Sequence, residues 1–235
     1  KSPNCPAASH FAEKRDNSVK DMKSQKIENG KLLEDAAEWR LLSLLFDCPD
    51  REKLEQIDSL GRAVTDKKLK RAAKVAQKQA SEGLFHSIFG PGGPAPGREV
   101  SYRGWVQPGY MLSELSSFYE AFSYKPKTDE VPDHVAVETG FVAYLRLKEA
   151  FALECSNPEN AAITADASKT FIDEHLSKYA EQMSKILSNS GIEYLSLAGK
   201  ALFKRVGKDK DKKKQRYLPV LENDDVDDEL VCGIA

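Results

Sequence analysis

Apolar residues recur at helical spacing through most of the chain. Between residues 31 and 46 they stand three or four positions apart, which predicts an amphipathic helix that ends at Pro49. The same spacing predicts six further helical stretches, at residues 51–61, 65–82, 111–122, 133–154, 168–187 and 191–203. No run shows the alternation that is typical of a strand, so we expect an all-α fold in one multi-helix domain.

Local signals place several helix boundaries. Asp133 is expected to cap the helix that runs to about Glu154, and Asn157 is expected to cap a helix that begins at Pro158. Gly61 is expected at the end of the second helix, because glycine commonly follows the last helical turn.

A loop rich in glycine and proline interrupts the helical pattern. Residues 90–97 hold four glycines and three prolines, a composition that forms neither a helix nor a strand. Phe85, Phe89, Tyr102 and Trp105 flank it, which is unusual for a flexible linker. We therefore expect a rigid loop that joins two helical halves and lies against the core. It lacks the phosphate-binding pattern G-x-x-x-x-G-K-[ST].

The two ends of the chain differ from its middle. Residues 1–29 are polar and are expected to be loosely ordered, whereas residues 30–206 form the helical domain. Residues 207–235 are expected to be a flexible charged tail. Eight basic and two acidic residues fill 204–216, and six acids without a base fill 222–229, so the two blocks cancel in the total charge.

Net charge and hydropathy exclude several classes of protein. The 235 residues carry a net charge of −2, which argues against a dedicated nucleic-acid binder. The longest apolar stretch, residues 41–46, falls far short of the ~20 residues of a membrane span. We found no leader pattern, so a cytoplasmic location without membrane insertion is expected. The basic residues between 67 and 78 suggest either a solvated helix face or a docking face for an acidic partner.

The sequence contains no recognised catalytic or metal-binding pattern. The four cysteines are dispersed, without a C-x-x-C pair, as expected for reduced thiols in the cytoplasm. His134 and Glu138 share a helix face, but two ligands do not complete a metal site. There is no G-x-S-x-G motif. We therefore expect neither an enzyme nor a resident metal.

Three motifs carry a resemblance to a known family. Residues 84–94, with Phe89-Gly90-Pro91-Gly92 inside them, resemble the Phe-x-Gly-Pro-Gly loop of the TorD/DmsD/NarJ chaperones for molybdenum enzymes. Residues 132–138 resemble the Pro-Asp-His-x-x-x-Glu helix start of that family, and residues 171–176 resemble its Phe-x-x-x-His-Leu. The order and spacing agree across roughly residues 30–205. Tyr179 stands where a Trp is common in relatives.

The resemblance implies a chaperone for redox enzyme maturation. Such proteins bind the twin-arginine signal peptide or the N-terminal region of an apo molybdopterin oxidoreductase subunit of the DMSO-reductase type. They assist insertion of its bis(molybdopterin guanine dinucleotide) cofactor before Tat export. The molybdenum cofactor thus belongs to the client, and no permanently bound cofactor is expected.

Motif position also suggests a client-binding site. A twin-arginine signal peptide offers an Arg pair and an apolar core. A protein that binds it therefore needs carboxylates beside an aromatic groove, since hydrogen bonds from Arg to carboxylate are strong. The residues expected to supply these groups are Gly90, Pro91, Gly92, Trp105, Tyr119, Asp133, His134 and Glu138.

Two alternatives to the chaperone stay open. One is an all-α protein that binds GTP, as some members of the resembled family are reported to do. The other is a regulatory helical module without catalytic activity. The resemblance also allows either a monomer or a domain-swapped dimer, because a long loop joins the two halves.

Overall fold

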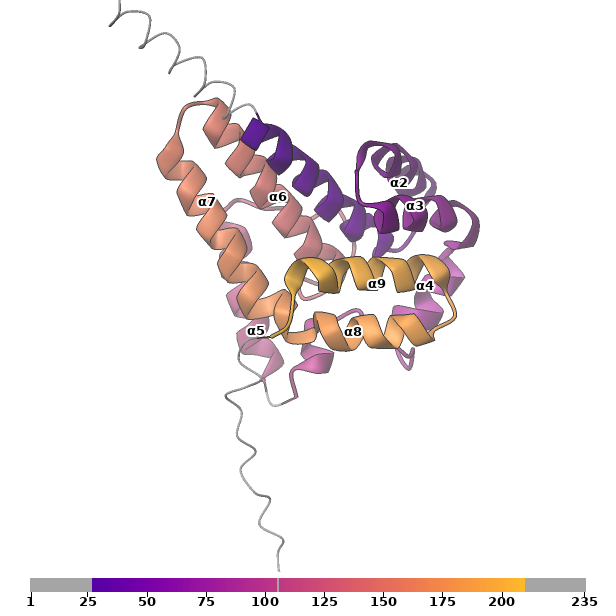
Figure 1. The fold of residues 1–235 in the computed structure, drawn as a ribbon. Coiled ribbons are helices and arrows are strands. Elements are labelled where there is room, and N and C mark those ends of the chain that lie inside the picture. The colour runs from indigo at the N-terminus through magenta and orange to yellow at the C-terminus, as the bar shows by residue number, and fades with distance from the viewer. Residues whose placement is uncertain (1–26, 105, 210–235) are drawn as a thin grey trace, which may run out of the picture.

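The computed structural model describes residues 27–104 and 106–209, which form helices joined by short connections (Figure 1). A first helix covers residues 27–45 of the described chain. The later α-helices are α2 (Arg51–Ala63), α3 (Lys67–Gln79), α4 (Glu82–Phe89), α5 (Pro108–Ala121), α6 (Val135–Glu154), α7 (Pro158–Phe171), α8 (Ser177–Asn189) and α9 (Glu193–Val206). A 3-10 turn, η1 (Glu99–Tyr102), and a π-helical turn, η2 (Ile172–Leu176), complete the list. The described residues contain no β-sheet, so the predicted all-α fold is confirmed.

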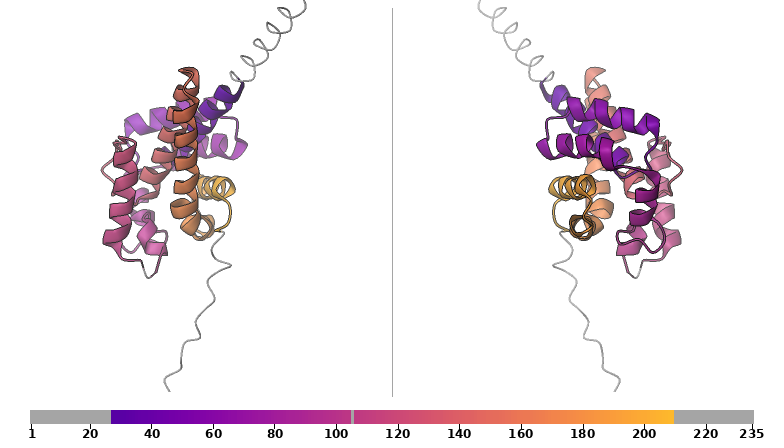
Figure 2. Two further views of the ribbon diagram at one scale, coloured as in Figure 1. Left: turned by 90° about the vertical axis from the view of Figure 1, so that its left-hand side faces the viewer. Right: turned by 90° about the vertical axis from the view of Figure 1, so that its right-hand side faces the viewer.

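Helices from both sides of the glycine-rich loop pack on one another. α9 lies against α8 and also against α3, which in turn packs on α2. α6 packs along α7 on the other side of the molecule, as the views of Figures 1 and 2 show. One hydrophobic core therefore holds both helical halves together in a single domain.

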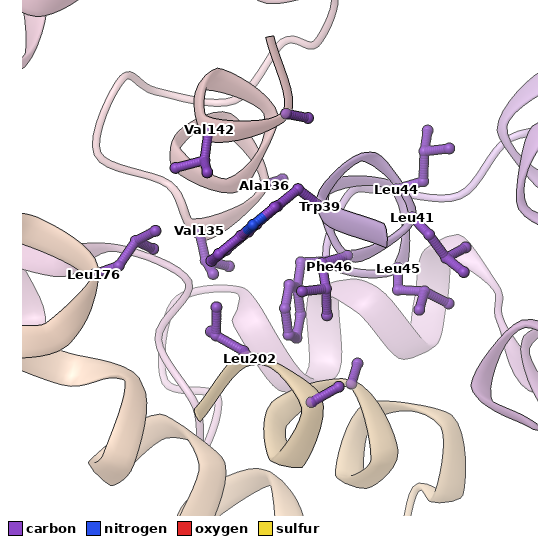
Figure 3. Close-up of a cluster of buried hydrophobic side chains, with 14 of the residues drawn as sticks. Trp39, Leu41, Leu44, Leu45, Phe46, Val135, Ala136, Val142, Leu176 and Leu202 are labelled. Carbon is purple, nitrogen blue, oxygen red and sulfur yellow. The ribbon is translucent and has the colours of Figure 1, made fainter. Parts of the chain in front are cut away.

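The second half of the first helix lies at the centre of this core. Its residues 41–46 are almost wholly buried on every side, apolar and polar alike. Trp39 belongs to the same cluster as Val135 of α6 and Leu202 of α9, and Figure 3 shows these side chains around the end of the first helix. A helix that is buried all round is typical of the middle of a helical domain.

The start of α6 is buried as deeply as the first helix. Every residue from 133 to 143 is buried, and the Ser43 hydroxyl donates a hydrogen bond to the Ala136 carbonyl at 2.8 Å. Gly140 leaves room for the side chains of Ser43 and Tyr124, because a Cβ there would lie 3.0 Å from the Ser43 hydroxyl oxygen and 2.6 Å from that of Tyr124. Polar side chains in this stretch must therefore find their partners within the protein.

Most predicted helix boundaries agree with the structure, and two do not. Asn157 caps α7, whose first residue is Pro158, and α6 ends at Glu154, as predicted. The prediction that Asp133 caps α6 is wrong, because His134 occupies the cap and Asp133 is held by an ion pair. The prediction that Gly61 ends its helix is also wrong. Gly61 lies inside α2, against Ala73 of α3.

The loop at residues 90–97 is tied to the elements beside it. The Ala95 N–H donates to the Ile88 carbonyl at 3.1 Å, and the Ala95 side chain is fully buried. The Tyr102 hydroxyl donates to the Pro96 carbonyl at 2.8 Å. The flanking aromatic residues thus hold the loop against the domain, as the sequence predicts.

Other predictions concern the ends and surface of the chain. Residues 1–26 and 210–235 lie outside the described residues, so the loose N-terminal segment and the flexible tail stay predictions. The six basic residues of α3 are exposed, and Arg71 is paired with Glu193 of α9. No helix among the described residues has the length and apolar character of a membrane span.

The contact of Gly61 with Ala73 predicts that an alanine substitution at Gly61 destabilises the fold. Gly61→Ala raises helix propensity but places a methyl group inside the Ala73 side chain, so we expect the free energy of unfolding to fall by about 1–3 kcal/mol. Urea denaturation followed by circular dichroism measures this change. The matched control is Gly83→Ala in α4, which has open space around it and should leave stability equal or higher. Equal effects of both substitutions would refute the packing role of Gly61.

Candidate functional site

The three sequence motifs meet in space around the start of α6. The loop leads into η1, the second motif begins α6, and the third motif covers the last residue of α7 and the whole of η2. Their polar side chains form one buried group, which we call the polar cluster and which comprises Glu99, Asp133, His134, Glu138, His175 and Tyr179. Segments that lie far apart in the sequence thus share a single interior site.

Asp133 fastens the end of the loop to the start of α6. Its fully buried carboxylate accepts hydrogen bonds from Arg98 Nε at 2.9 and 3.1 Å. Its backbone carbonyl accepts the Glu99 N–H at 2.8 Å, and the Val135 N–H donates to the Gly97 carbonyl at 2.8 Å. These bonds form an isolated antiparallel bridge in a helical protein. A buried carboxylate is tolerated here because a guanidinium pairs with it.

His134 caps α6 as a neutral side chain. Its Nδ1 accepts the Ala136 N–H at 3.3 Å, which requires that this nitrogen carry no proton. The ring packs against Phe85 and Phe89, with centroids about 6 Å away. Burial, helped by the charge of Arg98, lowers the pKa of His134 to about 4. The ring also fills the space in which a Cβ of residue 97 would lie, so only Gly97 fits there.

Glu138 lies deeper in the helix and points toward α8. Its Oε2 accepts the Tyr179 hydroxyl at 2.9 Å, and both side chains are fully buried. Burial raises the pKa of Glu138 well above its usual value, and the negative charge of Glu99 raises it further. Tyr102 stacks on Tyr179 with 5.5 Å between the ring centroids. The Tyr at this position therefore serves as a hydrogen-bond donor to the motif glutamate.

Glu99 joins the loop to the π-helical turn. Its Oε2 lies 3.0 Å from His175 Nδ1, and its Oε1 accepts from Arg103. Arg103 also donates to the Glu174 backbone carbonyl at 2.9 Å. Both Glu99 and His175 are fully buried, so this carboxylate and imidazole are shielded from water. η1 and η2 are consequently fixed relative to each other.

The predicted site residues fall into two groups. Four are buried around the polar cluster: Tyr119, Asp133, His134 and Glu138. The Tyr119 hydroxyl donates to the carbonyl of Pro132, the first residue of the second motif, at 2.8 Å. Pro91 and Gly92 are exposed at the tip of the loop, and Gly90 is half-buried against the His86 carbonyl. Trp105 lies outside the described residues. Asp133 and His134 thus fix the end of the loop, whereas Tyr119 and Glu138 bond to other segments and the loop tip is exposed.

Sequence reasoning missed half of the polar cluster. Glu99, His175 and Tyr179 were not assigned to the site, although Tyr179 bonds to Glu138 and the Glu99 N–H bonds to the Asp133 carbonyl. His175 could have been assigned from the sequence, because it is the histidine of the third motif. No local pattern marks Glu99, whose partners lie 76 positions later and on the neighbouring turn.

The surface carries an apolar pocket away from the polar cluster. It measures about 580 Å³ and lies between α6, α7 and the end of α5, and we call it the α6–α7 pocket. Phe151 and Ile163 in its lining are 71% and 54% exposed. Large apolar side chains that stay this exposed mark interaction surfaces when they cluster. A second pocket of about 380 Å³ lies nearby on α6 and includes Leu147, Arg40 and Lys127.

Removing the carboxylate of Asp133 should destabilise the fold. Asp133→Ala leaves Arg98 and the Val100 N–H without their acceptor, so we expect a loss of about 3 kcal/mol in the free energy of unfolding. Urea denaturation measures it. The control Asp129→Ala removes an exposed acid four residues earlier and should change stability by less than about 0.5 kcal/mol. A loss no larger in Asp133→Ala than in the control would contradict the anchoring role.

The neutral state of His134 predicts a pH dependence of stability. Its pKa is about 4 in the folded protein and about 6.5 in an unfolded chain, so its contribution is complete above pH 6.5 and is lost as the pH falls toward 4. The loss is on the order of 3 kcal/mol. His134→Asn keeps a capping side chain that does not titrate. Urea denaturation between pH 7 and 4 should show a steeper fall for the wild type, and parallel curves would rule the idea out.

Comparison with known proteins identifies the family. The family model for the nitrate reductase delta subunit matches residues 54–185, more than half of the chain, and these include all three motifs. No curated protein matches the chain. Among solved structures, it is similar to a candidate redox enzyme maturation protein from Archaeoglobus fulgidus, with 18% identity, 73% of this chain and 93% of that chain covered, and a TM-score of 0.48. The chain belongs to the nitrate reductase delta subunit family, the group of redox enzyme maturation proteins that its motifs indicate.

Proposed function

We propose that the protein is a molecular chaperone for an apo molybdopterin oxidoreductase. It binds the signal peptide or N-terminal region of the catalytic subunit and assists cofactor insertion before export through the Tat pathway. The observation that carries this proposal is an exposed apolar pocket on a member of a redox enzyme maturation family. The molybdenum cofactor belongs to the client in this proposal, and the chaperone works in the cytoplasm without catalysis.

The α6–α7 pocket suits an apolar segment of the client. Phe151 and Ile163 flank a concave surface of a size that accepts a few side chains of a helix or an extended peptide. Covering an exposed Phe side chain contributes about 1.5–3 kcal/mol. Lys148, which lies over the rings of Phe122 and Tyr144, gives the pocket rim a positive charge. The pocket therefore favours the apolar core of a leader rather than its Arg pair.

The Arg pair is better matched by acids beside the loop. Glu130 lies 3.8 Å from the neutral His134 ring, and burial together with the charge of Asp47 raises the pKa of Glu130. A guanidinium from the client offsets the repulsion between Glu130 and Asp47, and it donates a charge-assisted hydrogen bond to the Glu130 carboxylate. In this proposal Pro91 and Gly92 at the loop tip contact the client next to Glu130. Gly90, Tyr119, Asp133, His134 and Glu138 hold the tip in place.

Binding of a leader peptide tests both contacts. We expect Phe151→Ser to weaken binding of the client N-terminal peptide at least tenfold in isothermal titration calorimetry, because its apolar contact is lost. Tyr110→Ser is the matched control, since Tyr110 is an exposed aromatic residue at the far end of α5, 76% exposed. Glu130→Gln should weaken only the peptide that carries the Arg pair, not one with Gln-Gln in its place.

The outcomes separate the chaperone from its alternatives. If no leader or N-terminal peptide of a molybdopterin oxidoreductase binds, the proposed function is wrong. If binding occurs but Phe151→Ser and Tyr110→Ser behave alike, the pocket is not the contact. The same titration with GTP in place of the peptide tests the nucleotide-binding alternative.

A further inference from the structure

His175 presents a buried nitrogen that the polar cluster does not use. The side chain is fully buried in the π-helical turn η2, between Phe118 and Phe171. Its Nδ1 faces the Glu99 carboxylate at 3.0 Å, whereas its Nε2 has no hydrogen-bond partner among the described residues. A buried polar atom without a partner calls for an explanation, and the binding of an ion is one of them.

Two carboxylates lie close to the His175 ring. Glu114 of α5 and Glu174 of η2 are both exposed, and the ligand-type atoms of the three residues lie within 4.8 Å of one another. Because Nδ1 already faces Glu99, Nε2 is the ring nitrogen available to this group. The group joins two helical segments that are 60 positions apart in the sequence.

We propose that Glu114, Glu174 and His175 bind a divalent transition-metal ion, with Zn²⁺ as the best match to one imidazole and two carboxylates. This site is distinct from the α6–α7 pocket and does not depend on the chaperone function. It goes beyond the sequence expectation of no metal, which rested on ligands spaced within a single segment.

The Glu99–His175 contact has the geometry that supports a metal ligand. Metal-bound histidines usually donate their second ring N–H to a carboxylate, which fixes the tautomer and makes the free nitrogen a better donor to the metal. Glu99 occupies that place, and Arg103 holds the carboxylate through its other oxygen. The imidazole is therefore set with Nδ1 protonated and with the Nε2 lone pair free toward Glu114 and Glu174.

The distances require a small adjustment that the exposed side chains permit. Ligand atoms about 2.0–2.2 Å from a tetrahedral Zn²⁺ stand roughly 3.4 Å apart. The ligand-type atoms lie within 4.8 Å of one another, so the two carboxylates need to move inward by no more than about 1.5 Å. Both are on the surface, where rotamer changes cost little, while His175 stays fixed. A water molecule would complete the coordination, as in other three-ligand zinc sites.

The π-helical turn is consistent with a ligand site. Single π-turns inside helices are rare and occur often at functional positions. Here the turn interrupts the passage from α7 to α8 and contains both Glu174 and His175. The backbone irregularity therefore coincides with two of the three ligands and with the orphaned Nε2.

Metal titration of the full chain tests the proposal. We expect the wild type to bind one equivalent of Zn²⁺ at this site in isothermal titration calorimetry. The double variant Glu114→Gln and Glu174→Gln should bind at this site at least 100-fold more weakly, because two of three ligands lose their charge. Both residues are exposed, so the variant should fold as the wild type does. Glu120→Gln, an exposed acid on the same helix, is the matched control and should bind like the wild type.

Co²⁺ absorption distinguishes this site from the cysteines. Cobalt held by oxygen and nitrogen gives visible ligand-field bands without the thiolate charge-transfer absorption that cysteine ligands produce. The proposal is overturned if the wild type takes up no metal, if the double variant binds as tightly as Glu120→Gln, or if thiolate absorption accounts for all binding. Loss of the ligand-field bands in the double variant alone supports it.

Discussion

The burial of three acidic side chains in one place is the constraint on which the structure depends. Glu99, Asp133 and Glu138 are each completely excluded from water. An unpaired charge in such a place costs several kcal/mol, so each carboxyl must have a cation, a donor or a proton. These come from segments distant in the sequence: Arg98 and Arg103 from the loop side, and His175 and Tyr179 from the turn and helix after α7. Satisfying the acids therefore fixes the loop, the start of α6 and η2 together.

Most helices were predictable because each buries an apolar stripe, and such a stripe appears in the local sequence as apolar residues three or four positions apart. α4 was missed because its eight residues are too few for a clear period. Its stability comes from the Ser81 cap and the burial of Phe85 and Ile88, which depends on the rest of the fold. The cap of α6 went to His134 rather than to Asp133 for a similar reason. Arg98, 35 positions earlier, draws the Asp133 carboxylate away from the helix end, and no local pattern reveals such a partner.

The candidate site was predictable in position but not in exposure. The motifs place Asp133, His134 and Glu138 beside the loop, and the structure has them there. Carboxylates and aromatic rings are what a receptor for an Arg pair needs, yet a buried hydrogen-bonded network needs the same residue types. Only tertiary packing separates the two uses. Here the start of α6 is enclosed on all sides, so these groups bond to other buried groups of the protein. Pro91 and Gly92 are exposed to solvent instead, and Glu130 is partly exposed.

Glu99 connects the start of α6 with the π-helical turn η2. Its N–H bonds to the Asp133 carbonyl, and its carboxylate bonds to His175 and Arg103, while Arg103 also holds the Glu174 carbonyl. A displacement of α6 at Asp133 or of η2 at His175 is therefore transmitted to the other segment through these four hydrogen bonds, without a flexible linker between them. On the two proposals above, a metal ion at Glu174 and His175 that shifts Glu99 would also change the affinity of the loop for a client. Linkage would then require the client to change the affinity for the metal by the same factor, since coupling between two binding sites is reciprocal.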